Sequence, residues 1–63
     1  MTTRTYLAAE LASQIREADL QFWNGFTSWP MFELRRRGLL LLAERHGIAH
    51  DVRQELAVLE ASR

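Results

Sequence analysis

Two histidines and an aspartate come closest to a metal-binding pattern in this chain. His46 and His50 are four residues apart, and Asp51 follows directly after His50. Two histidines at this spacing bind one metal ion only when they share a face of a continuous helix, and Gly47 between them predicts a helix end. The chain also has no cysteine. We therefore expect no metal site, with His46 near the negative end of a helix and His50 in a loop.

The densest group of cations is the triplet Arg35, Arg36 and Arg37. Arginine binds phosphates and carboxylates through paired hydrogen bonds. Three consecutive helical residues spread over about 200°, so the triplet does not form one patch. We expect Arg36 and Arg37 beside the polar face, whereas Arg35 lies among apolar positions. There Arg35 either extends its methylenes along the core with its charge in water, or crosses an interface to a carboxylate or a tryptophan ring.

No catalytic pattern is evident. The chain contains no glycine-rich phosphate loop and no cysteine nucleophile, and its serines have no recognisable base nearby in sequence. A chain of 63 residues also has little capacity for a concave pocket. We expect a protein that is not an enzyme and that carries no cofactor.

The residues above are positioned by three predicted helices, in an all-α fold with one domain over residues 1–63. Apolar residues at helical spacing predict an amphipathic helix over 4–23, which Asn24 and Gly25 end. Pro30 in a first turn and Gly47 after the last turn bound a second helix over 29–46. Asp51 predicts the cap of a third, short helix over 51–61.

The second predicted helix has an apolar sector wider than half its circumference, because Leu34 and Leu41 extend it past Gly38. We expect this helix to be packed on two sides, between the first and third helices or between its own neighbours and a symmetry mate. Leu40 points into the polar sector and is the best single interface candidate. Gly38 indicates either a close helix crossing or a bend, since glycine weakens a helix.

Five of the six aromatic residues fall within eleven positions around the first predicted turn; they are Phe22, Trp23, Phe26, Trp29 and Phe32. Aromatic side chains at this density have to pack against something. We expect them to join the first two helices rather than to form a ligand site. Trp23, Phe26 and Trp29 are also candidate anchors of a protein interface, where aromatic residues and arginine are enriched.

The segment LLLLAERHGIAHDVRQELAVL, residues 39–59, resembles the helix-turn-helix segment of bacterial transcription regulators. Leu42, Ala43, Gly47 and Ile48 match that pattern in place, whereas Val52 comes five residues after the glycine instead of six. The resemblance implies a DNA-binding regulator in which His50, Arg53 and Gln54 face base edges while Arg35, Arg36 and Arg37 contact phosphates. Against this, the helix that would enter the DNA groove also carries three acidic residues, Asp51, Glu55 and Glu60. Affinity for DNA depends mainly on neutralising phosphate charges, which acidic residues oppose.

The overall composition favours a different function. Eight Arg balance eight acidic residues, so no net field attracts nucleic acid or an acidic membrane. A chain of this size buries only about 60% of its unfolded surface, and oligomerisation or a partner supplies the missing burial. No signal peptide or membrane span is indicated, which predicts a cytoplasmic protein.

We therefore expect a small protein-interaction module that acts as a regulator, inhibitor or accessory subunit. Its partner is a second copy of itself, a larger protein, or both, and a homodimer is the first expectation. Small stand-alone helical proteins of phages and mobile elements are an analogy for this role. The alternative is the helix-turn-helix regulator, with nucleic acid as the partner.

Overall fold

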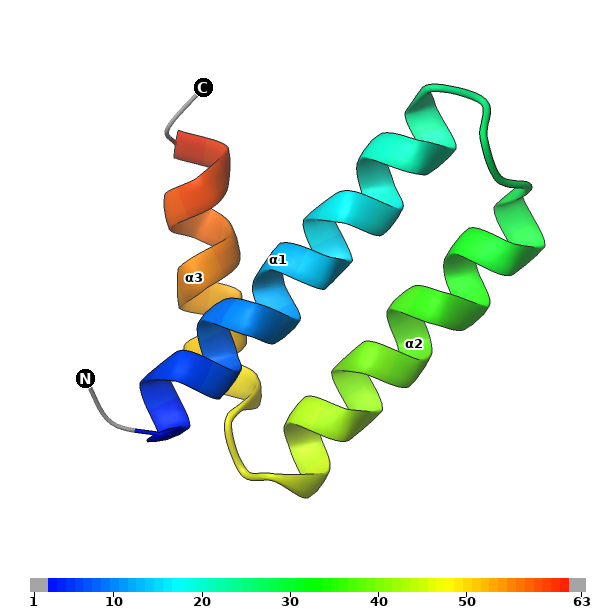
Figure 1. The fold of residues 1–63 in the computed structure, drawn as a ribbon. Helices are drawn as coiled ribbons and strands as arrows, with labels where there is room; N and C mark the ends of the chain where they lie inside the picture. Colours follow the sequence, from blue (N-terminus) through cyan, green and yellow to red (C-terminus); the bar gives the residue numbers. More distant parts are fainter. Residues whose placement is uncertain (1–2, 62–63) are drawn as a thin grey trace.

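The computed structural model describes residues 3–61, which form three helices (Figure 1). They are α1 (Thr3–Trp23), α2 (Trp29–Arg45) and α3 (Ala49–Ala61). No strand occurs in this range. The predicted all-α fold with three helices is confirmed, and each predicted helix boundary lies within two residues of the observed one.

The central helix of the bundle is α1 rather than α2. Both α2 and α3 pack extensively against α1, whereas α2 and α3 meet only briefly. Figure 1 shows α2 and α3 on either side of α1, with α3 crossing it at a steep angle. The Cα atoms span 35 × 27 × 14 Å, so the molecule is thin in one direction. Helix α2 contacts both other helices, as expected. The helix that lies between the other two, however, is α1 and not α2.

The position of α1 follows from small side chains on its second face. Leu11 and Ile15 are buried, as the apolar stripe of the sequence predicts. Ala8 and Ala12 beside them are also fully buried, and these small side chains let a second helix approach closely. The core cluster is completed from α2, the following turn and α3 by Ala43, Ile48 and Val52. Alanines that are unremarkable in the sequence therefore make α1 the shared element.

Both helix ends predicted from glycine have the same geometry. Gly25 and Gly47 have φ values of 78° and 69°, in the left-handed region that suits glycine. The N–H of Gly47 donates to the Glu44 carbonyl at 3.0 Å, and the N–H of Ile48 donates to the Ala43 carbonyl at 2.9 Å. These two bonds form a Schellman motif, and Gly25 makes the equivalent pair. Ile48 is thereby turned into the core, where it is buried.

The third helix begins earlier than predicted, and Asp51 does not cap it. The N–H of Val52 donates to the Ile48 carbonyl at 2.9 Å, which places the first turn at Ala49. Asp51 lies within that turn, and its carboxylate accepts a hydrogen bond from Arg4 Nε at 2.8 Å. Arg4 also donates through Nη2 to the Gly47 carbonyl at 2.9 Å. One arginine therefore ties the start of α1 to the turn between α2 and α3.

Candidate functional site

The main candidate site is an apolar strip along the face of α2 that points away from the core. Its exposed side chains are Met31, Leu34, Leu41 and Leu42, with Gly38 between them. The spacing of Met31, Leu34, Gly38 and Leu41 is three, four and three residues, which places them on one side of a helix. Leu34 is 66% exposed and Leu41 is 53% exposed. We call these five residues the outer stripe of α2.

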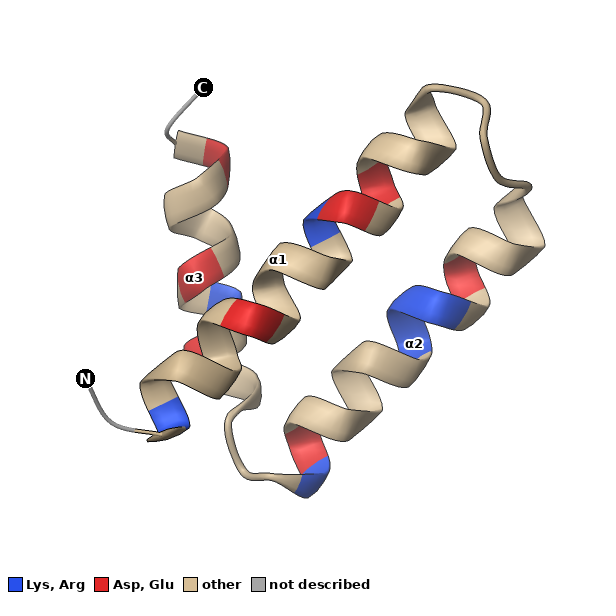
Figure 2. Cartoon of the chain, viewed as in Figure 1, with Lys and Arg blue, Asp and Glu red and all other residues tan. Residues whose placement is uncertain are grey.

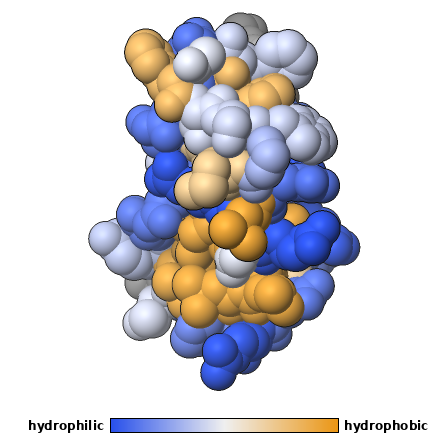
Figure 3. Space-filling view, turned by 90° about the vertical axis from the view of Figure 1, so that its right-hand side faces the viewer, coloured by the Kyte–Doolittle hydropathy of each residue, from blue (hydrophilic) through white to orange (hydrophobic). Residues whose placement is uncertain are grey.

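Figure 3 shows the side of the molecule on which α2 lies, and its lower half holds a continuous hydrophobic area bordered by hydrophilic side chains. The core-facing side of α2 is separate from this area, because Phe32 and Ala43 are buried and Leu39 packs against the core. The helix therefore has two apolar faces, and the chain itself covers only one of them. The second apolar face is the feature that the wide apolar sector of the sequence predicted.

The interface candidate Leu40 lies elsewhere than the sequence predicts. Its side chain is half-buried because it packs against the core cluster, so it is not among the exposed large apolar side chains. The reason is that α3 crosses the N-terminal half of α1, next to the C-terminal half of α2 that carries Leu40, so the core reaches further around α2 there than one neighbouring helix would require (Figure 1). Leu40 still lines an open groove with Leu41, Arg37 and Glu44. Leu34 and Leu41 take the fully outward positions expected of Leu40.

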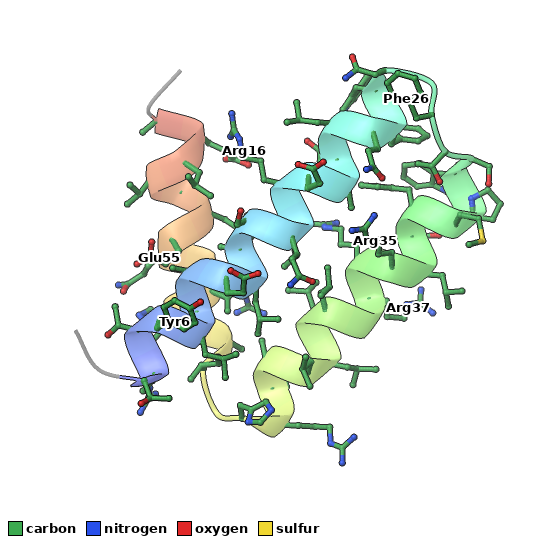
Figure 4. The ribbon with its side chains drawn as sticks, in the orientation of Figure 1. Tyr6, Arg16, Phe26, Arg35, Arg37 and Glu55 are labelled. Carbon is green, nitrogen blue, oxygen red and sulfur yellow. The ribbon has the colours of Figure 1, made fainter. Side chains whose placement is uncertain are left out.

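The aromatic residues join α1 to α2, as predicted. The ring of Phe22 stacks on Phe32 at a centroid distance of 4.9 Å and meets Trp29 edge to face at 5.3 Å. Phe32 is buried, whereas Trp23 and Phe26 are 75% and 80% exposed. Figure 4 shows Phe26 at the turn between the two helices, beyond their packed faces. The aromatic residues thus fall into two groups. The rings of Phe22, Trp29 and Phe32 pack against one another and join the helices, whereas Trp23 and Phe26 are largely exposed and available to a partner.

The three arginines of the triplet point in different directions, as the helical spacing predicts. Nη1 of Arg35 donates to Oε1 of Gln21 on α1 at 3.1 Å, so Arg35 bridges the two helices (Figure 4). Arg36 borders a groove of about 260 Å³ between the three helices, floored by Ile15 and Phe32. Arg37 extends from the side of α2 away from Arg35 and shares an open groove there with Arg36 (Figure 4). The triplet therefore offers no single phosphate-binding patch.

The residues of α3 that a DNA-binding helix would use are accessible. His50, Arg53 and Gln54 are all exposed, while Val52 on the other face is fully buried. Helix α3 carries Asp51, Glu55 and Glu60 beside its arginine, and residues of both signs are spread over the molecule (Figure 2). Arg53 therefore lies among charges of both signs and is not part of a basic surface.

The histidines do not assemble a metal centre within residues 3–61, where no group of three His, Cys, Asp or Glu side chains is placed to hold an ion. Asp51, the third nominal ligand, is engaged by Arg4 instead. His46 follows the last residue of α2, and His50 lies in the first turn of α3 rather than in a loop. This difference arises because α3 begins at Ala49.

Sequence reasoning did not anticipate two arginines that hold α3 in place. One is Arg4, described above; the other is Arg16, whose Nη1 donates to the Leu59 carbonyl near the end of α3 at 3.2 Å. Figure 4 shows Arg16 reaching from α1 toward α3. Both contacts join residues 43 or 47 positions apart, so no local pattern could have indicated them.

Among residues 3–61, no helix has the length and hydrophobicity needed to cross a membrane. Comparison with known protein families, with curated proteins and with solved structures finds no significant match to this chain.

Proposed function

We propose that this protein is a protein-interaction module whose docking surface is the outer stripe of α2, extended by the exposed aromatic side chains of the neighbouring turn. In this role it acts as a regulator, inhibitor or accessory subunit and performs no catalysis itself. The observation that carries the proposal is the second apolar face of α2, on which Leu34 and Leu41 are more than half exposed.

The physical support is the cost of leaving such a surface in water. Each square ångström of apolar surface removed from water contributes about 25 cal/mol, and a contiguous exposed patch typically marks an interaction site. Trp23 and Phe26 are exposed at the turn that leads into α2, in which Met31 belongs to the first turn. Large aromatic residues are the usual anchors of protein interfaces.

The charges around the stripe support a protein partner rather than a polyanion. Helix α2 carries Glu33 and Glu44 as well as four arginines (Figure 2), so both signs border the apolar residues. A polar rim of both signs around an apolar centre is the usual anatomy of a protein interface. A nucleic-acid-binding domain usually carries an excess of cations, whereas the formal net charge of this chain is zero.

The test is affinity capture with the tagged protein in cells that express it, followed by identification of what remains bound at about 0.5 M salt. An apolar interface survives this salt because screening acts on charges and not on apolar burial. We expect the wild type to retain a defined protein that a Leu41→Glu variant loses. The interaction is then measured again with both components purified.

The matched control is Tyr6→Glu, which places the same charge at an exposed apolar residue on α1, away from the outer stripe. This variant should keep the partner. Retention of the partner by Leu41→Glu, or its loss from both variants alike, would contradict the assignment of the docking surface.

A second candidate function is the helix-turn-helix regulator. The observation in its favour is the turn at Gly47, which buries Ile48 and Val52 and leaves His50, Arg53 and Gln54 exposed on α3. In that motif the second helix presents exposed polar side chains to the major groove. The mixed charge of α3 makes this the weaker proposal.

DNA binding is tested by fluorescence anisotropy with labelled duplexes over a range of salt concentrations. A DNA-binding protein should lose affinity steeply with salt, and Arg53→Ala should weaken it. Arg45→Ala, at the end of α2, is a control for the loss of one positive charge. The regulator proposal fails if no duplex binds at about 50 mM salt.

A further inference from the structure

Gly38 has no structural reason within the chain. It lies in the middle of α2, where glycine weakens a helix relative to alanine. Its φ is not positive, so its backbone conformation suits any residue. A Cβ added there would have no atom within 4 Å, so no neighbouring part of the chain needs the space. The space that this glycine leaves therefore opens outward, in the middle of the outer stripe.

We propose that the outer stripe binds the same stripe of a second copy, with the two α2 helices antiparallel and Leu41 of each copy filling the space beside Gly38 of the other. The inference rests on the proposed function, which makes the stripe a protein interface, and it names the partner.

The shape of the stripe is complementary to itself. Leu41 projects from α2 and Gly38, one turn earlier, leaves a gap, so a single helix face holds both the projection and the space that accepts it. A two-fold axis brings each projection onto the gap of the other copy, as an isologous interface requires. The spacing of Leu34, Gly38 and Leu41 is the four-then-three pattern of helices that pack side by side.

The charges select the antiparallel arrangement. When Leu41 lies opposite Gly38 of the second copy, Glu33 falls within about one residue of the level of Arg45 of that copy, and Arg37 within about two residues of the level of Glu44. Opposite charges therefore border both ends of the contact. Parallel helices would instead place the three arginines of each copy at the same level, where like charges repel.

A second copy also supplies what the thin bundle lacks. A chain of 63 residues buries only about 60% of its unfolded surface, less than a larger domain does, and α2 in particular is covered on one side only. The contact along α2 extends over about 25 Å of helix. Two-fold symmetry places Met31 and the exposed turn aromatics of each copy near the C-terminal end of the other α2, which enlarges the buried area.

The first test is sedimentation equilibrium on the full chain and on Gly38→Gln. Glutamine is a good helix former, and its side chain meets nothing within the chain, but it fills the gap that receives Leu41. We expect the wild type to dimerise and Gly38→Gln to raise the dissociation constant at least about tenfold. Tyr6→Gln, exposed on α1, should dimerise like the wild type.

The stability of the monomer shows whether Gly38 serves the interface or the fold of the single chain. In a Leu41→Glu background, where the dimer is absent, adding Gly38→Ala should raise the melting temperature by about 4 °C, because alanine favours the helix. Gly38 thus weakens the monomer and serves the dimer. Equal dimerisation of the wild type and Gly38→Gln would overturn the proposal.

The orientation is tested by disulfide formation, since the protein has no cysteine of its own. In the antiparallel register Leu34 lies opposite Arg45 of the second copy, whereas the two Leu34 residues are about 16 Å apart along the helices. A mixture of Leu34→Cys and Arg45→Cys chains should therefore form a mixed disulfide, and Leu34→Cys alone should not. Disulfide dimers of Leu34→Cys alone would overturn the antiparallel arrangement.

Failure of this inference is distinguishable from failure of the proposed function. A wild type that stays monomeric at about 0.5 mM overturns the homodimer, while salt-resistant capture of a different protein that Leu41→Glu loses still supports the outer stripe as a docking surface. A monomer that also captures no protein contradicts both.

Discussion

At the scale of single residues, the three glycines have different structural roles, although each follows a polar residue and precedes an apolar one. Gly25 and Gly47 hold left-handed conformations that end α1 and α2, whereas Gly38 is an ordinary helical residue. Gly47 has the larger structural effect of the two helix ends, since it turns Ile48 into the core. The Gly47 carbonyl also accepts a hydrogen bond from Arg4, so the turn is fixed both by its own backbone bonds and by a side chain from α1.

Replacing Gly47 with alanine should destabilise the fold by about 1 kcal/mol, because a Cβ disfavours the left-handed conformation. Asparagine tolerates that conformation better, so Gly47→Asn should lose less. Urea unfolding followed by circular dichroism measures both variants. Equal losses from alanine and asparagine would show that conformation is not the cause.

The ion pair between Arg4 and Asp51 should contribute little on its own. It lies at the surface, with side-chain exposures of 65% and 35%, and such pairs contribute at most about 1 kcal/mol. A double-mutant cycle with Arg4→Met and Asp51→Asn should give a coupling free energy of that size, reduced by salt. Arg4→Met should cost more than Asp51→Asn, since Arg4 also binds the Gly47 carbonyl.

At the scale of helices, α1 is distinguished by its alanines. Its sequence predicts one apolar stripe, but the buried alanines on the adjoining face allow α3 to pack there as α2 packs on the other side. The outcome depends on side-chain size, which a hydrophobic pattern does not record. Helix α2 shows the converse, because its second apolar face is lined by large side chains and stays uncovered.

Enlarging the close-packed face of α1 should therefore be costly. Ala12 is fully buried, and Ala12→Leu should destabilise the fold by about 1 to 3 kcal/mol through overpacking. Ala57 on α3 is exposed, so Ala57→Leu adds the same atoms and should change stability by less than about 0.5 kcal/mol. Thermal unfolding of the two variants is a direct comparison, and similar losses would contradict the close packing of α1.

At the scale of the whole molecule, the bundle is thin. Its Cα extents are 35 × 27 × 14 Å, so the shortest direction is about half of the next one. This arrangement of three helices leaves large apolar side chains exposed on α2 and at the aromatic turn. Covering these side chains is what the proposed association would add to the stability of the fold.

Self-association predicts a melting temperature that depends on protein concentration, because dimerisation stabilises the folded state by mass action. Thermal unfolding at about 5 and 500 μM should give a higher melting temperature for the more concentrated wild type. Leu41→Glu should melt at the same temperature at both concentrations. A wild type without this dependence would contradict a dimer in that range.

The sequence by itself determined the helices, because apolar spacing, Pro30 and the glycines act within a few residues of chain. It also determined that α2 has more apolar surface than one neighbour covers, and that the three arginines diverge. The helix-turn-helix resemblance and the interaction role stay predictions.

Only the tertiary structure decided which helix is central, that Leu40 turns toward the core, and that Asp51 binds Arg4 instead of capping α3. Each of these depends on how closely two distant segments approach, and that distance is set by the sizes of side chains on both. The outer stripe, centred on Gly38, depends on both levels. Helical spacing places its residues on one face of α2, and the packing of α1 and α3 against the other face leaves them uncovered.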